Sequence, residues 1–397
     1  MFHERRSDQT VDLEITLHAK KVTSRKKPAI ASRFDRFFDQ RRNVWEWSCR
    51  LGSPSDSTLG APDILFSTEE LLQEMISRCY SAASDWGILD EGRTAIITLH
   101  KMSRSYENSE GTFFIKKREL YRLILLTTSE RLVSTHLTDN ITSMLDSIQA
   151  CAQVIGTPPE PIVCDFVGTT GYATIDLVLS PEVSAVLIHE LVGHLTEELA
   201  SSGNPICRIA SPKLTVLSLS PDDNQYDDEG TKIRQINLVK EGLLCEPLMD
   251  RVTVNSCGGQ ASGMAQAAYH GGVPRLRCTH LAVQPGMDGA DKFIRELRKG
   301  VFCTSTTGGL FSNGTAFLAI DSCHALLSGE ISGRHVPILC IIDFRKVIGN
   351  FEAVGADLTL SKLGECLKAG ERLPSRVIAP SILLKNVQVR HLTENGY

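Results

Sequence analysis

Apolar residues occupy every second position over residues 11–17, close to the start of the chain. Alternation with a period of two predicts a strand that buries one face. The chain then stays polar and rich in arginine to about residue 60, with Trp45 and Trp47 as its anchors. We interpret this stretch as a solvated connection.

A helical spacing begins at Ser67. Ser67 and Glu70 form a capping box, and apolar residues follow at steps of three and four until Gly87. This pattern predicts an amphipathic helix. A second helix is expected over residues 140–155, which precede a glycine and two prolines. Between the helices, apolar runs predict strands over residues 95–99, 112–115, 123–127 and 132–136.

Beyond residue 172 the pattern predicts one more strand, a helix and then mainly strands. The strand, over residues 173–179, leads into Ser180 and Pro181, which suit the N-cap and first position of a helix. After residue 230, short alternating runs meet at turns such as 313–314 and 328–329, which favour antiparallel hairpins. We therefore predict an α+β fold, with an N-terminal α+β domain over residues 1–170. A mainly antiparallel β domain follows over residues 171–397, with the helix at the junction.

Length and composition are those of a globular protein. The 397 residues are 42 % hydrophobic and 22 % charged, which leaves room for two or three domains. The longest apolar run, over residues 336–342, is far shorter than the roughly 18 residues of a membrane helix. The first ten residues carry no apolar segment typical of a signal peptide. With twelve dispersed cysteines, typical of free thiols, we expect a cytoplasmic protein that does not contact a membrane.

The net charge of −5 combines a basic start with an acidic remainder. Residues 1–50 carry 12 Lys and Arg against 7 Asp and Glu, and the other residues carry 30 against 40. The basic residues near positions 20–27 lack stacking aromatics and a recognition helix, so we expect no nucleic acid as a partner. In the acidic part, Asp227, Asp228 and Glu229 do not have the spacing of a calcium loop. We interpret them as a structural turn.

The informative motif is His189-Glu190-Leu-Val-Gly193-His194, within the predicted helix. Neutral imidazoles suit zinc, and a carboxylate beside the first can take a proton from a metal-bound water. The histidines are five positions apart, so on a regular α-helix their side chains point about 140° apart and cannot share a metal. One extra residue in a π-type turn realigns them, and Gly193 is best suited to yield there.

On these residues alone, the motif could also decorate an exposed helix face. The preceding run, over residues 183–188, is apolar nearly all round, which favours a buried motif. Burying two histidines and a glutamate without a partner costs several kcal/mol, and a metal compensates for that cost.

Residues 175–194 resemble the metal-binding segment of the TldD/PmbA family of metallopeptidases, whose active branch carries His-Glu-x-x-x-His. The likeness covers about residues 173–390. Four other segments match in the same order: residues 227–230 with 240–243 and 248–251, residues 274–279 with 284–286, residues 299–300 with 308–309, and residues 364–370 with 379–380. After the second histidine, the family's usual Leu-Glu-Gly-Asp run is replaced by Leu195-Thr-Glu-Glu198. The first 170 residues are short and divergent for the family.

By this resemblance, His189 and His194 are zinc ligands, Glu190 is the general base, and Cys366 is the third ligand. A catalytic zinc ion keeps three protein ligands, and a thiolate is a suitable third one. From its sequence neighbours alone, Cys366 does not stand out among the twelve cysteines. Lys368 nearby either helps to hold the thiolate or is solvated.

The resemblance further implies a zinc-dependent peptidase that acts on unstructured peptides, for example by trimming the leader of a modified peptide precursor. It implies a dimer, either of two copies of this chain or with another family member. Two alternatives stay open. One is hydrolysis of an amide or peptide bond in a small-molecule conjugate of a natural-product pathway. The other is a non-catalytic, cavity-forming subunit, which is disfavoured because the metal-free branch of the family lacks the histidines present here.

Overall fold

The protein has the predicted α+β fold, in a computed structural model. The structure describes residues 3–18, 21–26, 30–39, 44–52, 68–85, 93–126, 132–156, 160–202, 211–220, 225–246, 248–268, 272–343, 350–361 and 364–392. Within these residues, no helix combines the length and the apolar character needed to cross a bilayer.

The chain divides into two compact units. Unit 1 comprises Met1–Pro159, Asp228–Gly230 and Ala267–Pro274, and unit 2 comprises Glu160–Asp227, Thr231–Gln266 and Arg275–Tyr397. Two short segments from the later part of the sequence thus belong to unit 1. The domain division at residues 170 and 171 stays a prediction.

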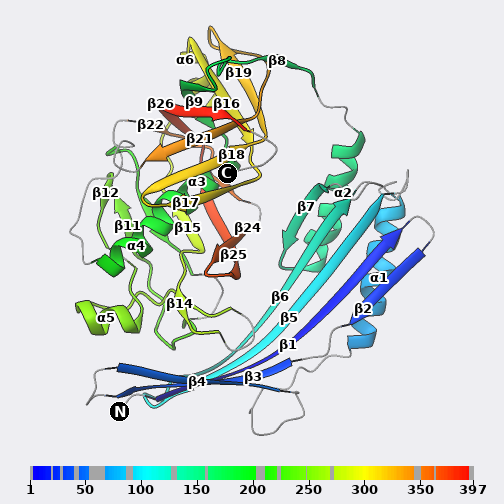
Figure 1. Ribbon diagram of the computed structural model, residues 1–397, viewed down its shortest axis with the longest axis vertical. Helices are drawn as coiled ribbons and strands as arrows, with labels where there is room; N and C mark the ends of the chain where they lie inside the picture. Colours follow the sequence, from blue (N-terminus) through cyan, green and yellow to red (C-terminus); the bar gives the residue numbers. More distant parts are fainter. Residues whose placement is uncertain are drawn as a thin grey trace. The chain divides into compact units, whose positions relative to one another are not determined.

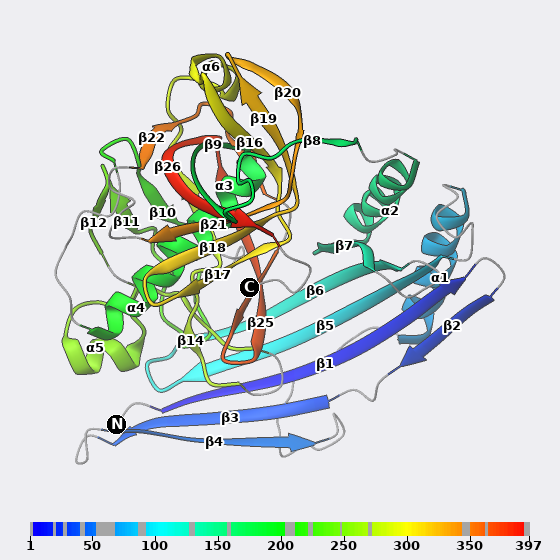
Figure 2. The ribbon, with the colours of Figure 1, turned by 45° about the horizontal axis from the view of Figure 1, so that its top comes forward.

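Unit 1 is built on one antiparallel sheet, with the strand order β4-β3-β1-β5-β6-β7 and with β2 paired to β1. The strands β1, β5 and β6 run side by side along much of their length (Figures 1 and 2). The elements are β1 (His3–His18), β2 (Lys21–Lys26), β3 (Ile30–Asp39), β4 (Val44–Gly52), α1 (Thr68–Asp85), β5 (Thr94–Asn108), β6 (Phe113–Leu126), β7 (Leu132–Thr138) and α2 (Ile141–Gly156).

The strand β1 buries opposite faces at its two ends. Near its C-terminal end, Leu13, Ile15 and Leu17 lie in an apolar core with residues of α1 and α2. Near its N-terminal end the even-numbered positions are buried instead, including Glu4, Arg6 and Asp8, and Ser7 is buried as well. Because successive side chains of a strand point to opposite faces, the face that is mainly buried differs between the two halves.

Buried charged side chains on β1, β3 and β5 form ion pairs with one another and with the acidic run of Asp228 and Glu229. Arg104 on β5 donates to Asp8 and to Asp228, both at 2.6 Å. Arg36 on β3 pairs with Glu229 at 2.7 Å. Burial raises the pKa of Asp228, but Arg104 and other nearby cations hold that pKa well below its usual value. The acidic run is thus a turn, as predicted, and it is buried in ion pairs within unit 1.

Two predictions about unit 1 are wrong. The stretch up to residue 60, expected to be a connection, contains the strands β2, β3 and β4. The separate strands expected at 112–115 and 123–127 are parts of the single strand β6. In both cases the charged residues indicated a solvated loop. The structure instead pairs these segments as strands of one sheet and buries some of their charges, including Arg36 and Lys116.

Unit 2 is mainly β and contains two large sheets and a two-stranded pair, β13-β14. The larger sheet has the order β17-β18-β21-β26-β9-β16-β19-β20-β8, with β22 paired to β26. Its strands are β8 (Ile162–Cys164), β9 (Tyr172–Leu179), β16 (Lys299–Ser305), β17 (Gly308–Ser312), β18 (Thr315–Ile320), β19 (Ser322–Leu327), β20 (Glu330–His335), β21 (Ile338–Asp343), β22 (Phe351–Val354) and β26 (Ile382–His391).

The second sheet of unit 2 has the order β12-β11-β10-β15-β25-β23, with β24 paired to β25. The remaining strands are β10 (Val216–Ser218), β11 (Asn237–Lys240), β12 (Leu243–Leu244), β13 (Ala265–Gln266), β14 (Arg275–Leu276), β15 (His280–Val283), β23 (Thr359–Leu360), β24 (Gly364–Lys368) and β25 (Glu371–Ala379). The helices are α3 (Pro181–Ile188), the π-helix η3 (His189–Gly193), α4 (His194–Ser202), α5 (Arg251–Cys257) and α6 (Ala290–Glu296).

The helix formed by α3, η3 and α4 shares the core of unit 2 with both sheets. It contacts β16, β17 and β18 of the larger sheet and β25 of the second sheet. Its buried residues Val183, Leu187 and Leu191 belong to one apolar cluster with strand residues of both sheets. The predicted hairpins at 313–314 and 328–329 are confirmed, since they join β17 to β18 and β19 to β20. The core thus surrounds the helix that carries the histidine motif.

Candidate metal centre

The histidine motif lies on a helix whose start and distortion were both predicted. Ser180 accepts a hydrogen bond from the backbone N–H of Val183, and Pro181 opens the helix. The segment His189–Gly193 is a π-helix, as expected from the five-residue spacing of the histidines. The extra residue in this turn rotates His194 back toward the side of the helix that carries His189.

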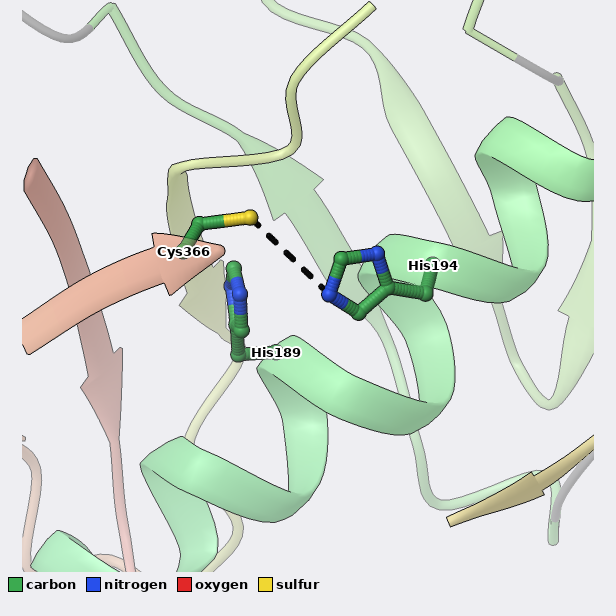
Figure 3. Close-up of side chains that lie close together, drawn as sticks. All are labelled: His189, His194 and Cys366. Atoms are coloured by element: carbon green, nitrogen blue, oxygen red, sulfur yellow. Dashed lines mark hydrogen bonds between the residues drawn. The ribbon is translucent and has the colours of Figure 1, made fainter. Parts of the chain in front are cut away.

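The structure brings His189, His194 and Cys366 together. One donor atom from each side chain lies within 4.8 Å of the other two, and Cys366 Sγ is 3.9 Å from His194 Nε2. Figure 3 shows Cys366, on strand β24, on the side of the helix that carries both imidazoles, with its sulfur directed toward the His194 ring. The rings of His189 and His194 meet edge to face, with centroids 5.0 Å apart. The three ligands that the family resemblance implied therefore lie in one cluster.

The chemistry of this cluster fits a zinc ion. His189 Nε2 is buried and has no hydrogen-bond partner among the described residues, whereas its Nδ1 shares a hydrogen bond with Ser375 Oγ at 3.3 Å. A buried ring nitrogen without a partner is costly, and a metal ion satisfies it. Two imidazoles and a thiolate are also suitable ligands for zinc, and a set of three leaves a position for substrate or water.

Cys366 and His194 each shift the pKa of the other toward its charged form. Burial acts to raise the pKa of the Cys366 thiol, but the His189 and His194 imidazoles outweigh it and lower that pKa to about 6. Burial acts to lower the pKa of His194, but Cys366 and Glu197 outweigh it and raise that pKa to about 10. A site that stabilises a thiolate already holds this donor in the form that binds metals.

Glu190, the predicted general base, lies beside the cluster and faces a pocket. Its Oε2 is 3.6 Å from His194 Nε2, and its side chain is largely buried. The pocket has a volume of about 560 Å³ and is lined by Glu190, His194, Phe311 and Lys368, among others. Gly309 on β17 makes room for this carboxylate, because a Cβ atom there would lie 2.5 Å from Glu190 Cγ.

Lys368, which we expected either to hold the Cys366 thiolate or to be solvated, instead pairs with Glu197. Its Nζ donates to the carboxylate of Glu197 rather than to the Cys366 thiolate, and it is partly buried rather than fully solvated. Burial raises the pKa of Glu197, but His194 and Lys368 outweigh that effect and hold it below the usual value. Lys368 therefore acts on the cluster through a carboxylate.

Sequence reasoning missed two buried charged residues close to the ligands, Glu197 and Arg277. Glu197 lies one turn after His194 in α4, and Arg277 follows β14. Arg277 stands in the segment 274–279 that resembles the family, whereas Glu197 stands in the run 195–198 that departs from it, and neither was given a role. For Glu197 the available signal was a carboxylate three positions after His194, on the same side of the helix.

Comparison with known proteins identifies the family. Residues 172–391, more than half of the chain, match the family model described as PmbA/TldA metallopeptidase C-terminal domain. The chain belongs to the PmbA/TldD family. The matched range contains His189, Glu190, His194 and Cys366. Membership of a metallopeptidase family thus agrees with the prediction made from the motif.

Curated PmbA/TldD relatives carry metalloprotease names. A "Metalloprotease" of Methanothermobacter thermautotrophicus is 28 % identical over 227 residues, which cover 54 % of this chain and 50 % of that protein. A "Zinc metalloprotease TldD homolog" of Saccharolobus solfataricus is 24 % identical over 250 residues, which cover 60 % of this chain and 56 % of that protein. The chain therefore spans about half the length of these curated relatives.

The fold as a whole is that of a solved PmbA/TldD structure. TldE from Thermococcus kodakarensis superposes with a TM-score of 0.69 at 13 % identity. The superposition covers 98 % of this chain and 96 % of that chain. The fold is therefore shared along nearly the entire chain, including the part that precedes the family match.

Proposed function

We propose that this PmbA/TldD protein is a zinc-dependent peptidase whose metal is held by His189, His194 and Cys366. The observation that carries the proposal is the convergence of these three donor atoms within 4.8 Å, beside Glu190 and a pocket. When bound, zinc supplies a Lewis acid that polarises the carbonyl of the scissile bond and acidifies water.

Glu190 is the general base in this proposal. Its carboxylate lines the pocket, where a substrate carbonyl and a water molecule can reach it. The carboxylate accepts the proton of the attacking water and can return it to the leaving amine. Gly309 keeps the space around Glu190 open, and Val186, four residues earlier on the same helix, also lies close to that glycine position. The chain thus provides a base in a defined position next to the metal ligands.

The geometry supports an extended peptide as the substrate. Strand β17, which ends the order of the larger sheet among the described residues, carries Gly309, Leu310 and Phe311 along the pocket. An unstructured peptide can pair with such an edge strand through its backbone and place a carbonyl near Glu190. Trimming of a leader peptide from a precursor is a reaction of this type.

We further propose that the protein acts in the cytoplasm as a dimer, with a second copy or with another PmbA/TldD member. The described cysteines are free thiols, which suits a reducing compartment. Light scattering tests the dimer. A mass of 43.6 kDa, with and without a second family member, would count against it.

Zinc analysis of the purified protein tests the metal site. We expect about one equivalent of zinc in the wild type and less than half in Cys366→Ser. Cys257→Ser is the matched control, because Cys257 is an exposed thiol in α5 and its loss should leave the zinc content unchanged. A wild type with less than half an equivalent, or a Cys366→Ser variant that keeps full zinc, contradicts the proposal.

A further inference from the structure

We propose that Glu197 and Arg277 are positioning residues that hold two metal ligands in place, His194 and Cys366 respectively. The adjacent residues Arg277 and Cys278 link the support of one ligand to the support of the other, because Arg277 binds the Cys366 strand and the backbone of Cys278 binds Glu197. This inference rests on the metal site of the proposed function and assigns roles to residues outside its ligand set. The helix motif and the cysteine strand are far apart in sequence, so their donor atoms need a common support.

Glu197 orients His194. Its side chain is 1 % exposed, and its Oε2 lies 3.4 Å from His194 Nδ1. In the neutral form of the ring, which is the form that binds a metal, a hydrogen bond from Nδ1–H to this carboxylate leaves the lone pair on Nε2, the atom that faces Cys366. Glu197 therefore sets both the tautomer and the direction of one ligand.

Glu197 is itself held from two directions. Its Oε1 accepts a hydrogen bond from the backbone N–H of Cys278 at 2.6 Å. Its Oε2 accepts from Lys368 Nζ, on the same strand as Cys366. A buried carboxylate with several charge-assisted bonds keeps one rotamer, so the imidazole that it contacts is also restrained.

Arg277 restrains the hairpin that carries Cys366. Its side chain is buried, and its Nη2 donates to the backbone carbonyls of Cys366 at 3.2 Å and Glu371 at 2.7 Å. Its Nη1 lies 3.4 Å from the carbonyl of Lys368. These carbonyls belong to β24 and to the start of β25, so one planar guanidinium ties both strands of the hairpin.

The segment that contains Arg277 also touches the π-helix. A Cβ atom on Gly193 would lie 3.1 Å from Cys278 Cβ, so this residue packs closely against the helix turn between the histidines. Arg277 and Cys278 are adjacent in the chain, and they bind the hairpin and Glu197 respectively. One short segment therefore connects the helix ligand to the strand ligand.

Cobalt binding tests this inference without using activity. Protein freed of metal by a chelator is titrated with Co²⁺, and the absorption of the cobalt–thiolate bond reports ligation by Cys366. We expect Glu197→Gln and Arg277→Lys to bind Co²⁺ about 10- to 100-fold more weakly than the wild type. We also expect Arg277→Lys to show a weaker thiolate band, because the hairpin is less restrained.

Matched controls separate positioning from a change of charge. Glu198→Gln and Arg275→Lys make the same chemical changes at exposed residues close in sequence to Glu197 and Arg277. Both variants should keep the wild-type affinity for Co²⁺ and the wild-type cobalt spectrum. A substitution of the buried Arg277 can also lower the stability of the fold, so Lys368→Met, at a more exposed side chain, provides a second test. That side chain is 39 % exposed, and its loss removes the link between Glu197 and the hairpin, with an expected loss of affinity in a folded protein.

The outcomes distinguish this inference from the proposed function. If the wild type shows the thiolate band and Glu197→Gln, Arg277→Lys and Lys368→Met keep its affinity, the positioning roles are wrong while the metal site stands. If the wild type binds Co²⁺ without a thiolate band, both proposals are overturned.

Discussion

His194 Nε2 lies 3.9 Å from Cys366 Sγ, although 172 positions separate the two residues. One donor comes from the end of a π-helix and the other from a strand of a hairpin. An ion bound by both would cross-link two segments of unit 2 that meet only in the folded state. Metal binding and the stability of this unit should therefore be coupled.

Zinc should stabilise the protein against unfolding. A ligand that binds only the folded state, at about 1,000 times its Kd, adds roughly 4 kcal/mol to the free energy of unfolding. We expect thermal unfolding to shift upward when zinc is added to chelator-treated protein. In Cys366→Ser the shift should be much smaller, whereas Cys257→Ser should respond like the wild type. A wild type whose melting temperature ignores zinc would argue against ligands from both segments.

Glu190→Gln should lose peptide hydrolysis while it keeps its zinc. The amide has nearly the same shape as the carboxylate but cannot accept the proton of water, so we expect kcat to fall by about 10²- to 10⁴-fold. Turnover of an unstructured peptide and zinc content are measured on the same preparation. Equal turnover in the variant would remove Glu190 from the mechanism.

Gly309→Ala should also slow peptide hydrolysis, because the added methyl group displaces the Glu190 side chain. The new Cβ would lie 2.5 Å from Glu190 Cγ and 3.1 Å from Val186 Cγ1, so the carboxylate must move. Misplacing a catalytic group by about 1 Å can cost roughly 10²-fold in rate, and we expect a loss of that size with zinc content unchanged.

Gly289→Ala is the control for this substitution. Its added Cβ meets no atom within 4 Å, and the backbone at Gly289 is extended. It should keep wild-type activity. If Gly309→Ala is as active as this control, the close packing of β17 against Glu190 is not needed for the reaction.

Asp228→Asn should destabilise unit 1. Arg104 would keep Asp8 but lose its second buried carboxylate, and breaking a buried ion pair costs about 3 kcal/mol or more. Denaturant unfolding at pH 7 measures this loss. Asp146→Asn, which alters an exposed carboxylate on α2, should leave the midpoint unchanged.

The lowered pKa of Asp228 also predicts the acid dependence of stability. Because its folded pKa lies below its unfolded value of about 4, the stabilisation is complete above that value and falls as the pH drops toward the folded pKa. The wild type should therefore lose stability below about pH 4, and Asp228→Asn should lose less over the same range. Parallel curves for the two proteins would contradict the role given to this ion pair.

Local chemistry in the sequence determined the helix and its distortion. Ser180 and Pro181 start the helix through their own backbone preferences, and a five-residue histidine spacing requires one extra residue per turn if both rings are to face one ion. The hairpin turns were also predictable, because Asn313-Gly314 and Ser328-Gly329 suit a positive φ. Each of these features depends on neighbours within a few positions.

Tertiary structure decided the features that depend on distant partners. Arg104 and Asp228 look like surface charges in sequence, and their burial follows from a long-range pairing that neutralises both. The sequence neighbours of Cys366 did not distinguish it from the other cysteines; the family resemblance named it, and the fold sets it beside His194. Glu197 supports that histidine through contacts with Cys278 and Lys368, which only the fold brings together. A local pattern records backbone preference and burial periodicity, but the partner of a buried charge or thiol is set by the path of the whole chain.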